Sequence, residues 1–279
     1  MNSLALQQWF QCPSQPLVMG ILNVTDDSFF DGGKYVALHA AYDKAHALIK
    51  AGADIIDIGG ESTRPFAREI SVDEELSRVI PVIDALSQSS DTVISVDTSK
   101  PEIMIEALKH GAHLINDVNA LQAPGALAIA AQFKPWVVLM HRQGDAATMQ
   151  LSPDYPNGVI EAIDDFFQTR ISHCVQAGIA HDRLIIDPGF GFGKTVTHNL
   201  QLVNGIAAFK KHNCPILLGV SRKSTLGVLT EKPVEERMLA GIVMAQYAIT
   251  EGANIIRTHD VAETKEMIEL LENLHSHDC

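Results

Sequence analysis

The hexapeptide Gly52-Ala53-Asp54-Ile55-Ile56-Asp57 decides the fold class, because close copies of it recur along the chain. Two copies are Gly111-Ala112-His113-Leu114-Ile115-Asn116 and Gly252-Ala253-Asn254-Ile255-Ile256-Arg257, and a looser one runs from Gly178 to Asp187. The glycine suits a left-handed residue that closes a helix, and the apolar run suits a strand buried on both faces. Each copy ends on a polar side chain in the same register. The repeat therefore predicts a β/α array with chemistry at one rim.

Eight short apolar runs alternate with segments of helical period. The runs are 17–23, 54–59, 92–97, 113–117, 136–140, 183–187, 215–220 and 253–257. The expected helices are 37–50, 72–86, 101–109, 124–132, 159–175, 199–210, 234–250 and 260–274. Strict alternation implies crossover connections and parallel pairing, and eight units favour closure over an open sheet. We predict an α/β fold: a single-domain (β/α)8 TIM barrel over 17–275, after an N-terminal extension over 1–16.

The same repeat predicts where its final polar residues meet. The four copies fall on the second, fourth, sixth and eighth strands, and alternate strands contribute to one side-chain layer of such a barrel. Asp57, Asn116, Asp187 and Arg257 are therefore expected to converge at the carboxyl rim.

Composition narrows the class of protein. The chain has 279 residues, 20% of them charged, and a net charge of −13, which disfavours nonspecific binding to nucleic acid. No stretch has the roughly 18 uninterrupted apolar residues of a membrane span, and residues 1–16 lack the apolar core of a signal peptide. The four cysteines are scattered, which favours free thiols over a disulfide framework or zinc site. We expect a cytoplasmic enzyme.

Polar residues at the predicted strand ends form the candidate site. They are Asn23, Asp57, Asp97, Asn116, Asp117, His141, Asp187, Lys223, Arg257 and His259. Several lie within the predicted strands, at positions where a residue with only a structural role would usually be Val or Ile. Buried carboxylates and amides need partners, and a polar ligand with several donors would supply them.

Two cations follow the seventh and eighth strands, where barrels commonly bind anions. Lys223 and Arg257 each precede an expected helix, so backbone N–H groups could join their charges. The neighbouring Arg222 fits a solvated loop charge better. These features predict an anion site.

The glycine-rich run 187–194 is not a phosphate loop of the Walker type, because Gly189 and Lys194 are only five residues apart. Its alternating Gly and Phe suggest a loop that presents aromatic faces, with Phe190 either flooring a flat pocket or packing the loop. Metal-hydrolase and nucleophile chemistry are disfavoured, because H-x-H on the first strand, H-E-x-x-H and G-x-S-x-G are all missing. A polar pocket with an adjacent anion site remains.

Seven segments of the sequence closely resemble the dihydropteroate synthase family, which joins a pterin diphosphate to p-aminobenzoate in folate biosynthesis. They are 19–25, 57–65, 95–98, 115–117, 187–194, 219–224 and 257–259, with Glu61-Ser62-Thr63-Arg64-Pro65 and Ser221-Arg222-Lys223-Ser224 among them. Each is weak alone, but together they are specific. The resemblance implies a magnesium-dependent transferase, a homodimer and a target of sulfonamides.

The resemblance also implies residue roles. The pterin would be bound by Asp97, Asn116, Asp187, Lys223 and Arg257. The diphosphate would be held by Asn23, Arg64, Arg257 and His259, with Mg²⁺ at Asn23. The aminobenzoate pocket would be formed by Thr63, Pro65, Phe190, Lys223 and Ser224. The implied catalytic residues are Asp97, Lys223 and Arg257: loss of diphosphate leaves a cation on the pterin methylene, which the Asp97 carboxylate would favour before the amine attacks.

The chain departs from the family pattern in its loops. Asp26 and Phe30 stand where the first loop usually has Pro and Ser, Phe66 stands where the second usually has Gly, and Arg142 replaces a more typical Met. The loop changes leave the pterin residues intact and bear on aminobenzoate affinity, loop closure and the response to sulfonamides.

Two other functions fit the pattern less well. A pterin-binding methyltransferase barrel would normally be joined to or paired with a cobalamin-binding partner, and no second domain is present in the sequence. A silent paralogue that only binds a pterin or a protein would be signalled by loss of Asn23, Lys223 or Arg257, and all three are present.

Overall fold

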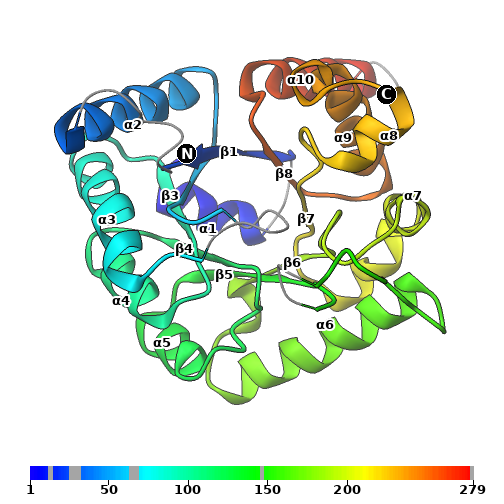
Figure 1. Cartoon of the computed structure of the whole chain (residues 1–279), viewed down its shortest axis with the longest axis horizontal. Helices are drawn as coiled ribbons and strands as arrows, with labels where there is room; N and C mark the ends of the chain where they lie inside the picture. The colour runs from blue at the N-terminus through cyan, green and yellow to red at the C-terminus, as the bar shows by residue number, and fades with distance from the viewer. Residues whose placement is uncertain (12–14, 25–32, 63–68, 145–147, 277–279) are drawn as a thin grey trace.

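The computed structural model describes residues 1–11, 15–24, 33–62, 69–144 and 148–276, which form a ring of parallel strands surrounded by helices (Figure 1). The strands are β1 (Leu17–Asn23), β2 (Ile55–Gly59), β3 (Val93–Asp97), β4 (Leu114–Asp117), β5 (Trp136–Met140), β6 (Leu184–Asp187), β7 (Leu217–Leu218) and β8 (Ile255–Thr258). They pair in the order β6-β5-β4-β3-β2-β1-β8-β7. A parallel bridge between Ile186 and Ile216 brings the two ends of this sheet together. The predicted (β/α)8 barrel is confirmed.

The glycine of each copy of the repeat ends a helix, as predicted. Its four glycines, Gly52, Gly111, Gly178 and Gly252, all have positive φ angles, between 93° and 119°. Each stands just after a helix, and all but Gly178, which is followed by a 3₁₀ helix at His181–Arg183, stand just before the next strand. A side chain is strained in this conformation, so glycine sets the point at which the chain turns back into the sheet.

Most predicted helices are present. The helices after β1 are α2 (Gly33–Lys50), α3 (Val72–Ser89), α4 (Pro101–Lys109), α5 (Ala126–Phe133), α6 (Val159–Gln176), α7 (Val196–Asn204), α8 (Ser224–Thr230), α9 (Met238–Glu251) and α10 (Val261–Ser276). Helix α8 was not predicted, and the helix predicted over 234–250 begins at Met238, after a 3₁₀ helix at Val234–Glu236. The single helix expected over 199–210 is wrong: α7 ends at Asn204, and a 3₁₀ helix, Ile206–His212, follows. At the break stands Gly205, where a Cβ atom would lie 2.6 Å from Ile160 Cδ1, so the chain turns at a residue without a side chain.

The core has two parts. Between the strands and the outer helices lies a large apolar layer that contains Ile56, Ile83 and Phe167. Inside the barrel, inward-facing strand residues such as Met19, Ile55 and Val93 form a second apolar cluster. Burial of these side chains on both faces of the sheet explains why the strands read as continuous apolar runs.

The N-terminal extension contributes to the second cluster. It forms helix α1 (Ser3–Gln11), whose Leu6 and Trp9 are buried against the inward-facing strand residues. The ring of Phe10 stacks on Trp136 with centroids 5.7 Å apart, and Val93 N donates to Met1 O at 2.9 Å. In Figure 1 this helix lies across the centre of the ring of strands. The extension therefore covers the apolar interior of the barrel.

Within the described residues, none of the helices combines the length and the apolar character needed to cross a membrane.

Candidate active site at the carboxyl rim

Asp57, at the carboxyl end of β2, is the centre of a buried polar network. Its side chain is fully buried and accepts three hydrogen bonds from three other strands. Ser95 Oγ donates to Oδ1 at 2.6 Å, Asn116 Nδ2 donates to Oδ2 at 2.9 Å, and Arg257 Nε donates to Oδ2 at 2.6 Å. Of the four residues predicted to converge, Asp57, Asn116 and Arg257 are joined directly by hydrogen bonds, and the fourth, Asp187, acts on Arg257 through its charge.

Arg257 joins this network to Asp97 on β3. Its second guanidinium nitrogen, NH2, donates to Asp97 Oδ2 at 2.6 Å. Burial opposes the charge of Arg257, but Asp57 and Asp97 outweigh that effect, so the pKa of the guanidinium is raised. Burial raises the pKa of the Asp97 carboxyl to about 7, against the lowering effect of Arg257. The cation is thus fixed between two carboxylates.

Asp97 also has an unused acceptor. Its Oδ1 atom is buried, yet it has no hydrogen-bond partner among the residues that the structure describes. Buried carboxylate oxygens are normally paired, and an unpaired one is costly. This atom fits an N–H donor from a bound ligand.

Asp187 and Lys223 add the fourth and fifth charged groups. Asp187 Oδ1 accepts from Gly189 N at 2.7 Å, and burial raises the pKa of this carboxyl while Lys223, Lys194 and Arg257 lower it. Lys223 Nζ donates to Phe190 O at 2.5 Å and lies 4.6 Å from the centre of the Phe192 ring. Burial lowers the pKa of Lys223 to about 8, although Asp187 opposes that shift.

The Phe190 ring, for which both a pocket floor and loop packing were considered, does not lie on the surface. It is fully buried in the apolar layer outside the strands, because the loop turns it into the core. What this residue offers Lys223 is its backbone carbonyl. Lys223 Nζ also lies 5.9 Å from the centroid of the Phe190 ring. The burial of the ring fits loop packing, and its place in the aminobenzoate pocket stays a prediction.

Of the remaining predicted site residues, the structure describes His259, Asn23 and Ser224 and does not describe those of the segment 63–68. His259 Nδ1 lies 3.0 Å from Ser221 Oγ, and burial together with Arg257 lowers the pKa of this imidazole to about 4, so it is neutral at pH 7. Asn23 is half-buried at the end of β1, and Ser224 is exposed at the start of α8. Thr63, Arg64 and Pro65 lie outside the described residues, as do Asp26, Phe30 and Phe66.

Three polar residues near the rim have structural contacts. Asp117 accepts from Asn119 N and Leu121 N, both at 2.7 Å, and so shapes the turn after β4. His141 is buried and contacts Lys194. Arg222 is not a free loop charge: its NH2 atom donates to Asp260 Oδ1 at 2.6 Å.

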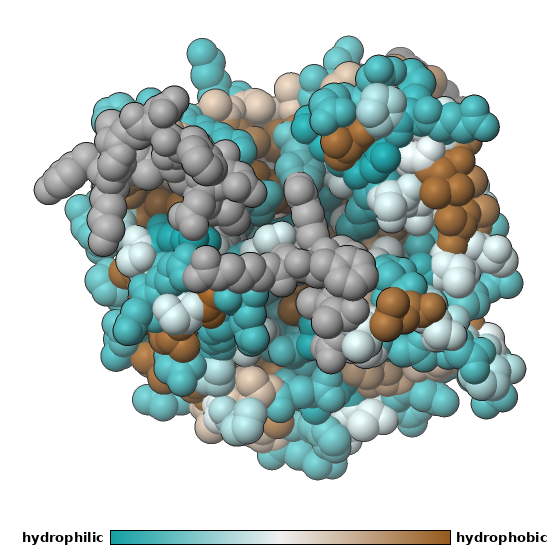
Figure 2. Space-filling model, viewed as in Figure 1, coloured by the Kyte–Doolittle hydropathy of each residue, from teal (hydrophilic) through white to brown (hydrophobic). Residues whose placement is uncertain are grey.

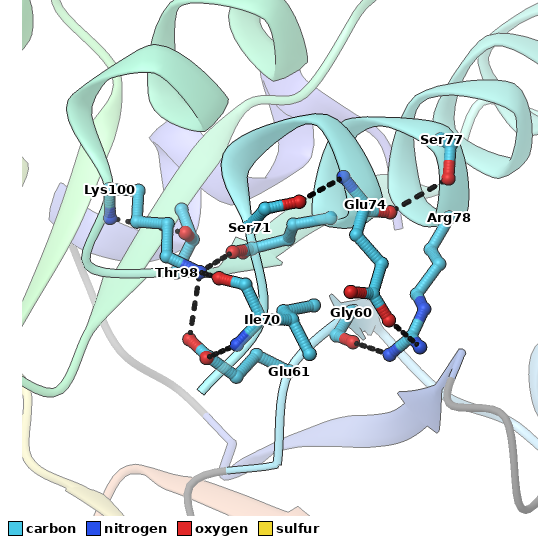
Figure 3. Close-up of polar contacts among 10 residues, drawn as sticks. Gly60, Glu61, Ile70, Ser71, Glu74, Ser77, Arg78, Thr98 and Lys100 are labelled. Carbon is cyan, nitrogen blue, oxygen red and sulfur yellow. Dashed lines mark hydrogen bonds and ion pairs between the residues drawn. The ribbon is translucent and has the colours of Figure 1, made fainter. Parts of the chain in front are cut away.

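After β3 stands a partly buried ionic group that was not predicted from the sequence, the Lys100 cluster, defined by Glu61, Ile70, Glu75 and Lys100. Figure 3 shows Glu61, Ile70 and Lys100 of this cluster. Lys100 Nζ donates to Glu75 Oε2 at 2.8 Å, to Ile70 O at 2.8 Å and to Glu61 Oε2 at 3.1 Å. Ile70 N donates to Glu61 Oε1 at 2.8 Å. The cluster therefore joins the two ends of the segment 62–69, which contains the predicted substrate residues. A pairing between residues 25 to 39 positions apart gives no local sequence signal.

Buried, converging charges at the carboxyl rim of a parallel barrel define a ligand-binding enzyme of the TIM-barrel class. The family described as pterin binding enzyme matches residues 19–259. Dihydropteroate synthase of Escherichia coli K12 is 51% identical over 93% of this chain and 92% of its own length. The crystal structure of the Yersinia pestis dihydropteroate synthase in a sulfonamide drug complex matches with a TM-score of 0.89, 49% identity, and coverage of 94% of this chain and 95% of that one.

A second solved relative, the Xanthomonas albilineans dihydropteroate synthase in complex with 7,8-dihydropteroate, has a TM-score of 0.85 and 40% identity, with 94% of each chain covered. The chain belongs to the dihydropteroate synthase family of pterin-binding enzymes. Its activity is that family's transfer reaction in folate biosynthesis, as the sequence predicted.

Proposed function

We propose that the condensation takes place on the network around Asp97, with Asp97, Asn116, Asp187 and Lys223 binding the pterin edge. The observation that carries this proposal is the buried Oδ1 atom of Asp97, which has no hydrogen-bond partner in the described part of the chain. A pterin edge carries amino and ring N–H donors together with a carbonyl acceptor. Two carboxylates, an amide and an ammonium at one rim match that pattern.

The catalytic contribution of these residues is electrostatic. As the C–O bond to the diphosphate breaks, positive charge develops on the pterin methylene, and the Asp97 carboxylate stabilises it in a site shielded from water. Arg257, held by Asp57 and Asp97, lies ready to pack on the pterin ring and to contact the departing diphosphate. The amine of p-aminobenzoate then forms the new C–N bond and loses a proton. No protein nucleophile takes part.

The diphosphate end would use His259, Asn23 and Arg64 together with Arg257. His259 is neutral at pH 7, so it would donate a hydrogen bond and not a charge. Within the described residues, no group of three or more His, Cys, Asp or Glu side chains could hold a metal. Mg²⁺ often keeps several waters and binds through one or two protein ligands plus substrate phosphates. The Asn23 amide oxygen fits that role, and the ion would neutralise the leaving group.

The aminobenzoate would lie against Lys223 and Ser224 at the start of α8, with Thr63 and Pro65 completing the pocket. The Xanthomonas albilineans relative has been solved with 4-aminobenzoic acid, at 42% identity and a TM-score of 0.89 over 94% of each chain. Sulfonamides, one of which is bound to the Yersinia pestis relative, would compete for this pocket.

The chain would act as a homodimer. An apolar groove between α7, α8 and α9 is lined by Leu200, Leu226, Leu229, Leu239, Val243 and Tyr247. Figure 2 shows brown, apolar residues at the edge of the molecule where Figure 1 places these helices. Leu239 is 71% exposed and Val243 is 58% exposed, and a contiguous apolar face of this kind marks a protein interface.

Sedimentation of the wild type and of Leu239→Arg tests the dimer. The substituted chain should sediment as a monomer, whereas Leu270→Arg, at an equally accessible apolar position on α10, should leave the dimer intact. A Leu239→Arg variant that stays dimeric would place the interface elsewhere.

A cytoplasmic location fits the thiols. Cys174 and Cys214 are both free and buried, as expected in a reducing compartment.

Release of diphosphate from 6-hydroxymethyl-7,8-dihydropterin diphosphate tests the reaction. With Mg²⁺ and p-aminobenzoate, release should be coupled to formation of 7,8-dihydropteroate. Pterin binding without release would contradict the proposal and favour a methyltransferase or a silent binder. Asp187→Asn and Lys223→Ala should each abolish pterin binding, and near-wild-type affinity in either would refute the pocket assignment.

A further inference from the structure

Lys194 is a buried cation that none of these roles uses. It ends the glycine-rich loop after β6 and is only 3% exposed. Its Nζ atom lies 3.0 Å from His141 Nδ1 and donates to Phe192 O at 3.1 Å. Among the described residues, no carboxylate oxygen lies within 4.0 Å of this nitrogen.

A cation in such a place is unfavourable. Burial lowers the pKa of Lys194 to about 7, with Lys223 adding to the effect and Asp187 opposing it. His141 offers no compensating charge, because burial and Lys194 lower its pKa to about 2 and its ring is neutral. An apolar side chain would fill this space without the cost of desolvation. Packing alone therefore does not explain why a lysine occupies this position.

The position of Lys194 suggests its role, because the ammonium lies next to the turn that carries Asp187. A Cβ atom on Gly189 would lie 3.4 Å from Lys194 Nζ and would overlap His141 O. Gly189 N donates to Asp187 Oδ1 at 2.7 Å, and His141 N donates to Asp187 O at 2.9 Å. Lys194 thus contacts His141 directly, and its ammonium lies next to the space that a side chain at Gly189 would enter.

We propose that Lys194 is a positioning residue for the pterin: it holds the Asp187 turn through His141 and Phe192, and its charge offsets the Asp187 carboxylate from beneath. This inference rests on the proposed binding of the pterin by Asp187. Three cations act on that carboxylate, namely Lys223, Lys194 and Arg257. Lys223 and Arg257 belong to the substrate surface, whereas Lys194 acts from inside the protein.

The consequence is a specific pH dependence. Pterin binding needs the ionised carboxylate of Asp187, and burial raises its pKa. Below about pH 7, Lys194 is protonated, so it opposes protonation of Asp187 throughout the acid range. Without that charge, Asp187 takes up its proton at a higher pH, and binding is lost earlier on acidification. Lys223 and Arg257 stay charged in the acid range. Asp97, whose pKa burial raises to about 7, titrates in the wild type and in the Lys194 variants alike, so the comparison between them isolates the effect on Asp187.

Lys194→Met tests the inference, with binding of 6-hydroxymethyl-7,8-dihydropterin measured by calorimetry between pH 5 and 8.5. We expect affinity at pH 6 to fall about tenfold and the acid midpoint to rise by about one pH unit. Lys194→Arg, which keeps the charge, should retain a midpoint near that of the wild type.

Asn199→Ala is the matched control for loop packing. Asn199 is 1% exposed and anchors the same loop through uncharged bonds, accepting from Gly191 N at 2.8 Å and donating to Thr225 Oγ1 at 2.9 Å. It should weaken binding without moving the midpoint. A wild-type midpoint in Lys194→Met, or an equal shift in Lys194→Arg or Asn199→Ala, would overturn the inference.

Asp187→Asn separates this inference from the proposed function. If Asp187→Asn loses the pterin while Lys194→Met keeps the wild-type midpoint, only the role of Lys194 is refuted. If Asp187→Asn binds like the wild type, the assignment of Asp187 to the pterin fails, and the role of Lys194 fails with it.

Discussion

Replacing Lys100 by Met should destabilise the barrel strongly, although Lys100 lies outside the proposed substrate contacts. Its ammonium makes three hydrogen bonds in the Lys100 cluster, and the side chain of Glu75 is only 1% exposed. Met fills a similar volume but leaves the Glu75 carboxylate without its cation. The change therefore removes one partner of a buried ion pair.

The magnitude follows from burial. Breaking a buried pair by removing one partner costs about 3–5 kcal/mol. Lys100 and Glu61 retain 17% and 21% side-chain exposure, so we expect the lower end, about 3 kcal/mol. At about 2–4 °C per kcal/mol for a large domain, the melting temperature should fall by about 6–12 °C.

The pH dependence has a definite sign. Burial lowers the pKa of Lys100, but the hydrogen bonds that it donates to Glu75 and Glu61, and the charges of those carboxylates, outweigh the effect of burial and raise the pKa above 10.5. The stability that Lys100 contributes is therefore complete below the unfolded-state pKa and is lost only as the pH rises through the folded-state pKa. The deficit of Lys100→Met should be equal at pH 7 and pH 9.

Thermal unfolding followed by circular dichroism measures this prediction, with Lys109→Met as the control. Lys109 also contacts a glutamate, Glu106, at 2.8 Å, but the two side chains are 53% and 38% exposed, so the melting temperature should not change. Combining Lys100→Met with Glu75→Gln should cost less than the sum of the single changes. A Lys100→Met variant as stable as Lys109→Met would refute the reasoning, because the cluster would then be fully solvated.

Three further outcomes are expected. Gly189→Ala should lose about 2 kcal/mol or more of stability, because φ is +71° and the new Cβ would overlap His141 O; an unchanged melting temperature would contradict this. Asp57→Asn should lower kcat/KM by at least about tenfold, because Arg257 loses a charged partner at 2.6 Å; equal activity in steady-state assays would show that Asp97 alone holds it. Since burial raises the pKa of Asp97 to about 7 and the ionised form is the active one, kcat/KM should rise between pH 6 and 8, and a flat profile would exclude this role.

Sequence and structure agree best where the information is local. Glycine followed by an apolar run specifies a helix end and a buried strand over six residues, so the repeat predicted four of the strands and a shared rim, and the eight apolar runs predicted the rest. Asp57, Asn116 and Arg257 meet as predicted, because register within equivalent repeats fixes which side chains point to the same layer.

Other features depended on tertiary packing. The Arg257–Asp97 pair joins residues 160 positions apart, and the Lys100 cluster depends on three elements meeting behind β3. The cover that α1 provides for the barrel interior was likewise not predicted.

The physical reason is that backbone periodicity and turn chemistry are properties of neighbouring residues, and the chain carries them in any context. Which side chains pair, and which charges are withdrawn from water, depends on the space left when distant elements pack together. The sequence by itself therefore determined the barrel and the residues at its rim. Only the tertiary structure decided how Asp57, Asp97 and Arg257 share their hydrogen bonds, and that Lys194 lies buried beneath Asp187.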